Sequence, residues 1–228
     1  MAMQSKSTAP SFQEFFESVS SYCERHPVIS QELVRAKEEF FFQTGKLQEG
    51  GQDFDNRINA FLLWFLFDRK WERSLRPPLS YYEEHLKKEG NVAAVNLLER
   101  QISHIHSLFR LIRFKKGRSL IQDMVTREKY WIDDEGVLSG VEKGIYFETR
   151  LFRVSGTWCL ANYLIPHPKT VKSEIGKRLK RIGGDKQALK KFCLELHSYY
   201  TKWQTYRNIS IKNIYRFGKS IPVLLFCV

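Results

Sequence analysis

The chain has 228 residues, of which 43% are hydrophobic and 27% charged, and 37 Lys and Arg against 25 acidic residues give a net charge of +12. This composition is typical of a folded globular protein and excludes disordered, collagen-like and coiled-coil classes. No apolar stretch of about 18 residues exists, so the sequence predicts no membrane span. The cysteines are widely spaced and the start of the chain has no apolar signal core, which favours free thiols and a cytoplasmic location.

The positive charge is concentrated near the end of the chain. Residues 167–228 carry 14 Lys and Arg against 3 acidic residues, whereas residues 1–55 carry 5 against 9. Segregation of this kind indicates either an anionic partner or a solvated surface that balances the acidic N-terminal helices. On charge alone both interpretations stay open.

The first 106 residues have the pattern of consecutive helices. Apolar residues recur at helical spacing in five runs, near residues 12–25, 33–45, 55–68, 80–90 and 92–105. We expect Ser30 and Asn91 to cap the second and fifth of these helices. The third is apolar on all sides, with Phe61 and Phe65 at its centre, so we expect it to be buried all round and to be the centre of stability.

Two charged residues, Asp68 and Arg69, follow this apolar helix. We expect an ion pair at this point to tie the helical region to the strands that come later in the chain. A buried pair of this kind adds specificity to a fold more than stability. We therefore interpret Asp68 and Arg69 as structural rather than catalytic.

The pattern changes after residue 107. Short runs rich in β-branched and aromatic residues predict strands at 120–125, 129–133, 144–154 and 157–164. Residues 107–114 are compatible with a helix end or with a strand. Four or five short antiparallel strands in this space suggest a small barrel or a strongly twisted meander. In the run 144–154 both alternating sets contain charged residues, so the inward face is left open.

The C-terminal part predicts a basic helical hairpin, with a helix over 170–182, a turn at Gly183 and Gly184, and a second helix capped by Asp185. Its Lys and Arg side chains could neutralise phosphates, and its aromatics could stack on bases or fill a core or an oligomer interface. The candidate residues for binding a protein or a nucleic acid are Lys172, Lys177, Arg178, Lys180, Arg181, Tyr199, Trp203 and Tyr206. The tail 221–228 is apolar and must be buried, bind a partner or aggregate.

No catalytic signature is present, and the isolated polar motifs have simple structural interpretations. His104 and His106 could share an ion only on a strand, and no cysteine or third histidine lies near them in sequence, so we expect no metal site. Asp133 to Glu135 could hold a cation but is typical of a hairpin turn. Cys159, within a β-run, is typical of a small buried residue rather than a nucleophile. We expect no catalytic residue and no cofactor.

The six residues Trp64 to Arg69 (WFLFDR) carry a family resemblance. The segment from about residue 55 to 165 resembles uncharacterised bacterial proteins in which a helix with a WF-x-FDR-like motif precedes a small β region. Some of these proteins end in a SEC-C metal-binding segment, whose cysteine and histidine cluster is absent here, so its zinc is not carried over. The resemblance implies a bacterial, cytosolic protein and no known catalytic residue.

The sequence as a whole predicts an α+β fold in three segments: helices over 1–106, a small antiparallel β-module over 107–166, and a basic helical segment over 167–228. We expect a non-enzymatic binding or regulatory protein whose partner is another protein or a second copy of itself. The alternative is a nucleic-acid-binding protein that uses the basic C-terminal helices.

Overall fold

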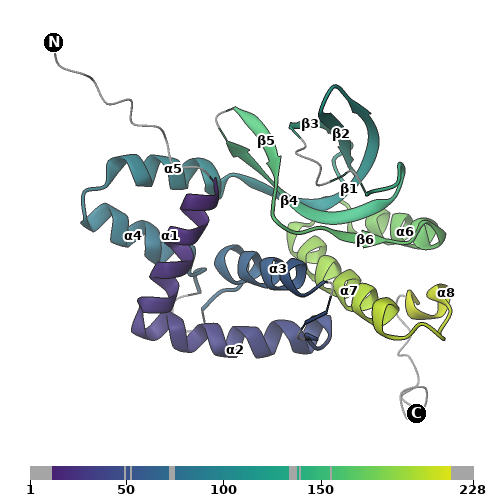
Figure 1. Ribbon diagram of the computed structural model, residues 1–228, viewed down its shortest axis with the longest axis horizontal. Coiled ribbons are helices and arrows are strands. Elements are labelled where there is room, and N and C mark those ends of the chain that lie inside the picture. Colours follow the sequence, from purple (N-terminus) through teal and green to yellow (C-terminus); the bar gives the residue numbers. More distant parts are fainter. Residues whose placement is uncertain are drawn as a thin grey trace. The chain divides into compact units, whose positions relative to one another are not determined.

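The computed structural model describes residues 12–48, 50–51, 53–71, 75–133, 138, 140–154 and 156–216. Helices and strands occur in separate stretches of the chain, which confirms the predicted α+β class (Figure 1). The chain divides into two compact units: unit 1 comprises residues 1–39 and 61–103, and unit 2 comprises residues 40–60 and 104–228. Within the described ranges, no helix is long and apolar enough to cross a membrane.

Unit 1 is helical. Its elements are α1 (Phe12–Arg25), the first part of α2 (Pro27–Thr44), the last part of α3 (Phe54–Phe67), α4 (Leu79–Lys88) and α5 (Val92–Ile102). α2 begins at Pro27 and not after Ser30, because proline at the first helical position lacks only an amide that would have no intrahelical partner. Asn91 caps α5 as expected, since its Oδ1 accepts a hydrogen bond from the Ala94 amide at 3.1 Å.

The apolar helix α3 is buried, as its sequence predicts. Phe61 and Phe65 are 3% and 1% exposed, and their ring centroids lie 6.2 Å apart. Just beyond α3, Arg69 donates from Nε to Glu39 at 2.8 Å and from Nη1 to Glu32 at 3.1 Å, while Asp68 beside it is half-buried. Both carboxylates lie on α2. These ion pairs therefore join two helices of unit 1, which corrects the expectation that they tie the helical region to the strands.

Unit 2 contains a β-barrel. Its strands in the described ranges are β1 (His104–Lys115), β2 (Arg118–Asp123), β3 (Lys129–Asp133), β4 (Tyr146–Val154), β5 (Thr157–Leu160) and β6 (Ile165–His167). Pairing of β1 with both β2 and β4 closes a ring in the order β1-β2-β3-β5-β4, and β6 adds to β4. The ring is antiparallel except for the β3–β5 pair, where Ile132 lies beside Trp158 in parallel. The expected antiparallel module is thus a barrel with one parallel closure.

The long strand β1 makes this closure possible. Its first half pairs with β4 and its second half with β2, and the register shifts between Leu111 and Arg113. An irregularity of this kind bends a strand and increases its twist, so one strand can serve two neighbours around a small barrel. The segment 107–114, ambiguous in sequence, is therefore strand throughout.

The strand β4 is buried on both faces. Phe147 and Leu151 belong to an apolar cluster inside the barrel, together with Phe109, Ile121 and Ile132. The opposite face packs against the C-terminal helices, which are the 3-10 turn η1 (Lys169–Val171), α6 (Lys172–Ile182), α7 (Lys186–Thr205) and α8 (Ile211–Ile214). A second apolar cluster forms there from Leu108, Met124, Tyr146, Ile175, Leu179, Leu196 and Tyr199, among others. The charged residues Glu148 and Arg150 share the helix-facing side with Tyr146 and are buried.

The end of α2 and the start of α3 also belong to unit 2. α2 ends at Thr44, and the next residue, Gly45, has a φ of 96°, which favours glycine. Arg57 of α3 caps this end by donating to the carbonyls of Gly45 and of Lys46, the latter at 2.6 Å. Its Nε lies 3.4 Å from Nε2 of His197 on α7. Residues 40–60 therefore fold with the strands and the C-terminal helices.

Candidate functional site

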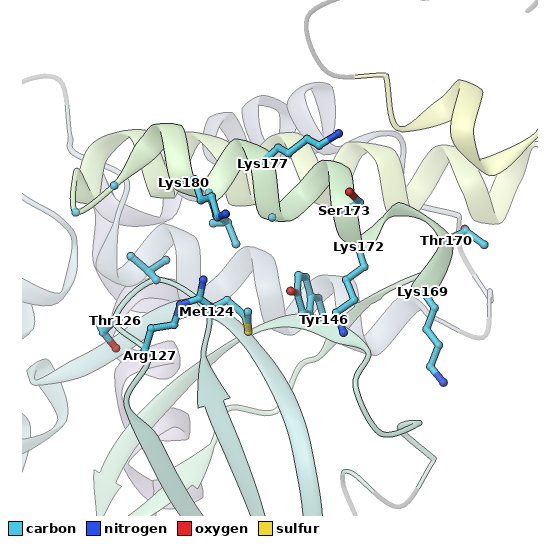
Figure 2. A pocket seen from close by; sticks show the side chains of 15 residues that line it. Met124, Thr126, Arg127, Tyr146, Lys169, Thr170, Lys172, Ser173, Lys177 and Lys180 are labelled. Carbon is cyan, nitrogen blue, oxygen red and sulfur yellow. The ribbon is translucent and has the colours of Figure 1, made fainter.

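An open groove of about 850 Å³ lies on unit 2 between α6 and the turn that joins β2 to β3. Among the described residues, its lining includes five Lys and Arg side chains and no Asp or Glu: Arg127, Lys169, Lys172, Lys177 and Lys180. Figure 2 shows Arg127 on the turn and Lys180 on α6 approaching from opposite walls. Thr126, Thr170 and Ser173 add hydroxyl groups. The groove therefore offers an anion both positive charge and hydrogen-bond donors.

The amphipathic pattern of α6 produces one wall of the groove. Ile175 and Leu179 are buried in the second apolar cluster, so the basic residues between them remain at the surface. Gly176 lines the groove and has no side chain to fill it. The opposite wall rests on the same cluster, because Met124 of the β2–β3 turn is also buried in it. Both walls of the groove therefore pack on the same apolar cluster.

The charges in the groove differ in how far they are neutralised. Lys169 pairs with Glu142, and Nζ of Lys172 lies 5.2 Å from the centroid of the Tyr146 ring. Arg127, Lys177 and Lys180 are exposed and make no ion pair with any residue that the structure describes. Three cations of the groove therefore face solvent without a neutralising carboxylate from the described residues.

The five basic residues predicted on α6 all lie at the surface but flank the helix on two sides. Lys172, Lys177 and Lys180 line the groove described above. Arg178 and Arg181, with Lys177 again, line a second hollow next to α8, which also contains Glu174. This second hollow includes a carboxylate in its lining, whereas no carboxylate lines the first groove among the described residues.

The aromatics predicted on α7 are not brought to the groove. Tyr199 is 9% exposed within the second apolar cluster, and its hydroxyl donates to Glu195 at 2.8 Å. Burial and this bond raise the pKa of Tyr199. Trp203 is half-buried against the same cluster, and Tyr206 is half-buried at the end of α7. Tyr199 and Trp203 thus contribute to the packing of unit 2, which is the core alternative that the sequence left open.

A second basic surface, which sequence reasoning missed, lies on the outer face of β1, β2 and β3. Trp131 is half-buried at its centre, with the guanidinium of Arg113 at 5.4 Å and that of Arg118 at 5.8 Å from the ring centroid. Arg118 also pairs with Asp133 at 2.8 Å. Lys115 and Lys129 are exposed on neighbouring positions of β1 and β3. We call this surface, made of Arg110, Arg113, Lys115, Arg118, Gln122, Lys129 and Trp131, the tryptophan face.

The tryptophan face continues toward the groove. Gln122 of β2 lies between Arg110 of β1 and Lys129 of β3 in the strand register. Its side-chain amide donates to the carbonyl of Arg127, a groove residue, at 3.0 Å. Arg113 and Lys115 stand on either side of Phe114, and this alternation was a sequence signal for an outward basic row. This pattern indicates a continuous basic surface only when β1, β2 and β3 are adjacent, and their adjacency is seen only in the structure.

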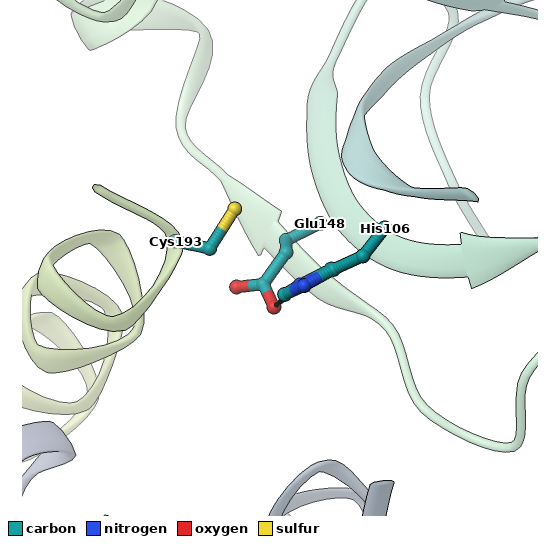
Figure 3. A group of neighbouring side chains, drawn as sticks. All are labelled: His106, Glu148 and Cys193. Carbon is teal, nitrogen blue, oxygen red and sulfur yellow. Dashed lines mark hydrogen bonds and ion pairs between the residues drawn. The ribbon is translucent and has the colours of Figure 1, made fainter. Parts of the chain in front are cut away.

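The histidine and cysteine motifs lie elsewhere in unit 2. His104 and His106 are on one side of β1, where Nε2 of His104 is 2.7 Å from Nη1 of Arg150 and Nε2 of His106 is 2.9 Å from Oε1 of Glu148. Figure 3 shows His106 and Glu148 together with Cys193 of α7. Cys159 is half-buried in β5. Asp133 ends β3, while Asp134 and Glu135 lie outside the described residues, as does the apolar tail 221–228.

Comparison of the chain with protein-family models, with curated proteins and with solved structures finds no match. Function is therefore inferred from the geometry of unit 2.

Proposed function

We propose that the protein binds nucleic acid through the basic groove of unit 2, without catalysis. The observation that carries this proposal is the set of exposed cations, Arg127, Lys177 and Lys180, in a groove that no carboxylate lines within the part of the chain that the structure describes. Lys and Arg in such a position displace the counterions of a phosphate backbone, which supplies most of the affinity of non-specific binding. Hydroxyl groups in the lining would add hydrogen bonds to phosphate oxygens.

The tryptophan face supports a single strand as the preferred form. Bases in a single strand can stack on an aromatic ring, and the stacking contributes about 1–3 kcal/mol per base. Trp131 offers a half-buried ring close to the guanidinium groups of Arg113 and Arg118, next to a row of cations that continues to the groove. The closed order of five strands is similar to that of oligonucleotide-binding barrels, whose β2–β3 face is used for binding. This likeness is one of fold alone, so the proposal depends on the residues.

The positions of the basic and aromatic residues support a nucleic acid, rather than a protein, as the partner. A protein partner was favoured because the α7 aromatics could form a contact surface, but Tyr199 and Trp203 pack against the second apolar cluster of unit 2. The basic residues of α6, by contrast, stay at the surface. We therefore place the binding function on Lys172, Lys177 and Lys180 with Arg127.

Fluorescence anisotropy with a labelled mixed-sequence single strand, longer than the ~16 nucleotides that one such barrel covers, tests this proposal. The affinity of the full chain should fall steeply with salt, by roughly 0.7 log units per log unit of salt for each phosphate neutralised. The double variant Lys177→Glu with Lys180→Glu should bind at least tenfold more weakly. Its salt slope should be shallower by about 1.4, because two phosphate contacts are lost.

Lys186→Glu with Lys191→Glu is the matched control, since it changes the net charge equally at exposed α7 positions that do not line the groove. This control should retain most of the affinity. Equal loss in both double variants would show that only the overall charge matters and would contradict a groove site. Absence of binding by the unmodified chain at low salt would also contradict the proposal.

A further inference from the structure

We propose that unit 2 binds one divalent metal ion of the zinc class between the barrel and α7, with His106, Glu148 and Cys193 as ligands. A ligand atom from each of these side chains lies within 4.8 Å of the others (Figure 3). A tetrahedral ion held at about 2.0–2.3 Å separates its ligand atoms by roughly 3.3–3.8 Å. The three atoms therefore lie close enough for modest side-chain movements to bring them around one ion. This site is separate from the proposed nucleic-acid groove.

Three elements converge on this point for reasons set by the fold. His106 on β1 and Glu148 on β4 both lie on the helix-facing side of adjacent, antiparallel strands. Cys193 belongs to the buried face of α7, which packs on that side. Glu148 is 5% exposed and Cys193 is 1% exposed. The cluster is therefore shielded from solvent, where ligation by protein groups competes best with hydration.

Glu148 gives an independent indication of a cation. Its Oε1 is 2.9 Å from Nε2 of His106 and accepts a hydrogen bond from the Tyr163 hydroxyl at 3.3 Å. Its Oε2 is also buried, yet no donor among the described residues reaches it. A buried carboxylate oxygen without a hydrogen bond costs free energy, and a metal ion at this position would remove that cost. Arg150, two residues further along the same face of β4, has its Nη1 2.7 Å from Nε2 of His104.

The chemical types of the three ligand atoms indicate which class of metal ion would bind. Calcium and magnesium prefer sites made entirely of oxygen atoms, whereas imidazole nitrogen, carboxylate oxygen and thiolate sulfur together suit zinc. Three protein ligands leave a fourth position for water. Tyr163 would orient the carboxylate from outside the ligand shell, as outer hydrogen bonds do in metal sites. Bound in this way, the ion would fix α7 against β1 and β4.

The experiment uses the full chain, stripped with a chelator and titrated with Zn²⁺ and with Co²⁺ alone. We expect one ion per chain, a thiolate-to-cobalt charge-transfer band, and a higher midpoint of thermal unfolding with zinc. Cys193→Ser should abolish the band and weaken zinc binding by about tenfold or more. The control Cys159→Ser alters a half-buried cysteine of the same unit that is outside the cluster, and it should bind metal normally.

Glu148→Gln is the second ligand variant, and it is read in the same titration if Cys193→Ser fails to fold. Its affinity for zinc should also fall, while the groove variant Lys177→Glu with Lys180→Glu should keep the metal, so the two proposals fail separately. A chain that binds no cobalt, shows no charge-transfer band and unfolds at the same temperature with and without zinc would overturn the inference. His106 and Glu148 would then be a metal-free ion pair.

Discussion

Acidification should destabilise unit 2 through two buried histidines. His167 on β6 and His197 on α7 are 1% and 2% exposed. Burial lowers the pKa of His167 to about 3. Burial, together with the charge of Arg57 and the proximity of His167, lowers the pKa of His197 well below its usual value. Both rings are therefore held neutral in the folded chain at a pH where free histidines become protonated.

The sign and size of the effect follow from proton linkage. An unfolded histidine has a pKa of about 6.5, so between about pH 3 and pH 6.5 the unfolded chain binds more protons than the folded one. Stability is unaffected by these groups above that window and falls as the pH falls through it. For His167, linkage gives a loss of about 2 kcal/mol in the free energy of unfolding between about pH 7.5 and about pH 5. His197 adds to the loss in the same direction.

Urea unfolding at a series of pH values measures this loss. His167→Gln keeps a polar group that can hydrogen-bond the Tyr215 hydroxyl, which lies 3.1 Å from Nδ1 of His167. That variant should lose about 2 kcal/mol less than the unmodified chain over the same interval. His85→Gln, on α4 of unit 1, is the control and should follow the unmodified chain. A loss below about 1 kcal/mol in the unmodified chain, or an unchanged slope in His167→Gln, would refute the reasoning.

Two further substitutions test the packing of each unit. Phe65→Ala should lower the free energy of unfolding by about 3–5 kcal/mol because it empties a core position, whereas Phe42→Ala, at a 92% exposed ring on α2, should change it by less than about 0.5 kcal/mol. Gly45→Ala should destabilise by at least about 2 kcal/mol, because the new Cβ would lie 2.7 Å from Cγ2 of Thr201 at a φ of +96°. Gly156→Ala is the control, because Gly156 has a similar φ of +88° but no atom close to the new Cβ. The difference in the free energy of unfolding between the two variants measures the clash with Thr201, and equal losses of stability would contradict that contact.

The fold class was predictable because the spacing of hydrophobic residues can be read from short stretches of sequence. The change from helical spacing to short β-branched runs located the barrel, and Asp185 caps α7 at the predicted position, with its Oδ1 accepting from the Gln187 amide at 2.9 Å. Closure of the barrel was not predictable, because it depends on the parallel pairing of Ile132 with Trp158, and no pattern near either residue indicates its partner. The inward face of β4 was ambiguous for a physical reason: both of its faces are buried, so alternation does not separate core from solvent.

The candidate sites were predictable only in part. Basic residues on one side of α6 are visible in its amphipathic pattern, but the opposite wall, with Arg127, comes from a turn about fifty positions earlier. His106 raised the question of a metal, and no cysteine or third histidine was near it in sequence. The fold supplies Glu148 and Cys193 from β4 and α7, at distances along the chain that no short motif covers. Sequence thus located single ligands and single charges, while their convergence depends on tertiary structure.

The buried polar residues of unit 2 restrict how its helices can pack on the barrel beneath the groove. Both walls rest on the second apolar cluster, through Met124 of the β2–β3 turn and Leu179 of α6. Apolar contacts alone are non-directional and would permit α7, and with it α6, to slide on the barrel. Buried hydrogen-bonded groups have a strong geometric preference, because a mismatched pairing leaves a buried polar group without a partner. The contact of His167 with Tyr215 joins β6 to the end of α8, and that of Arg57 with His197 joins α3 to α7, so these two contacts restrict where α7 and α8 sit in unit 2.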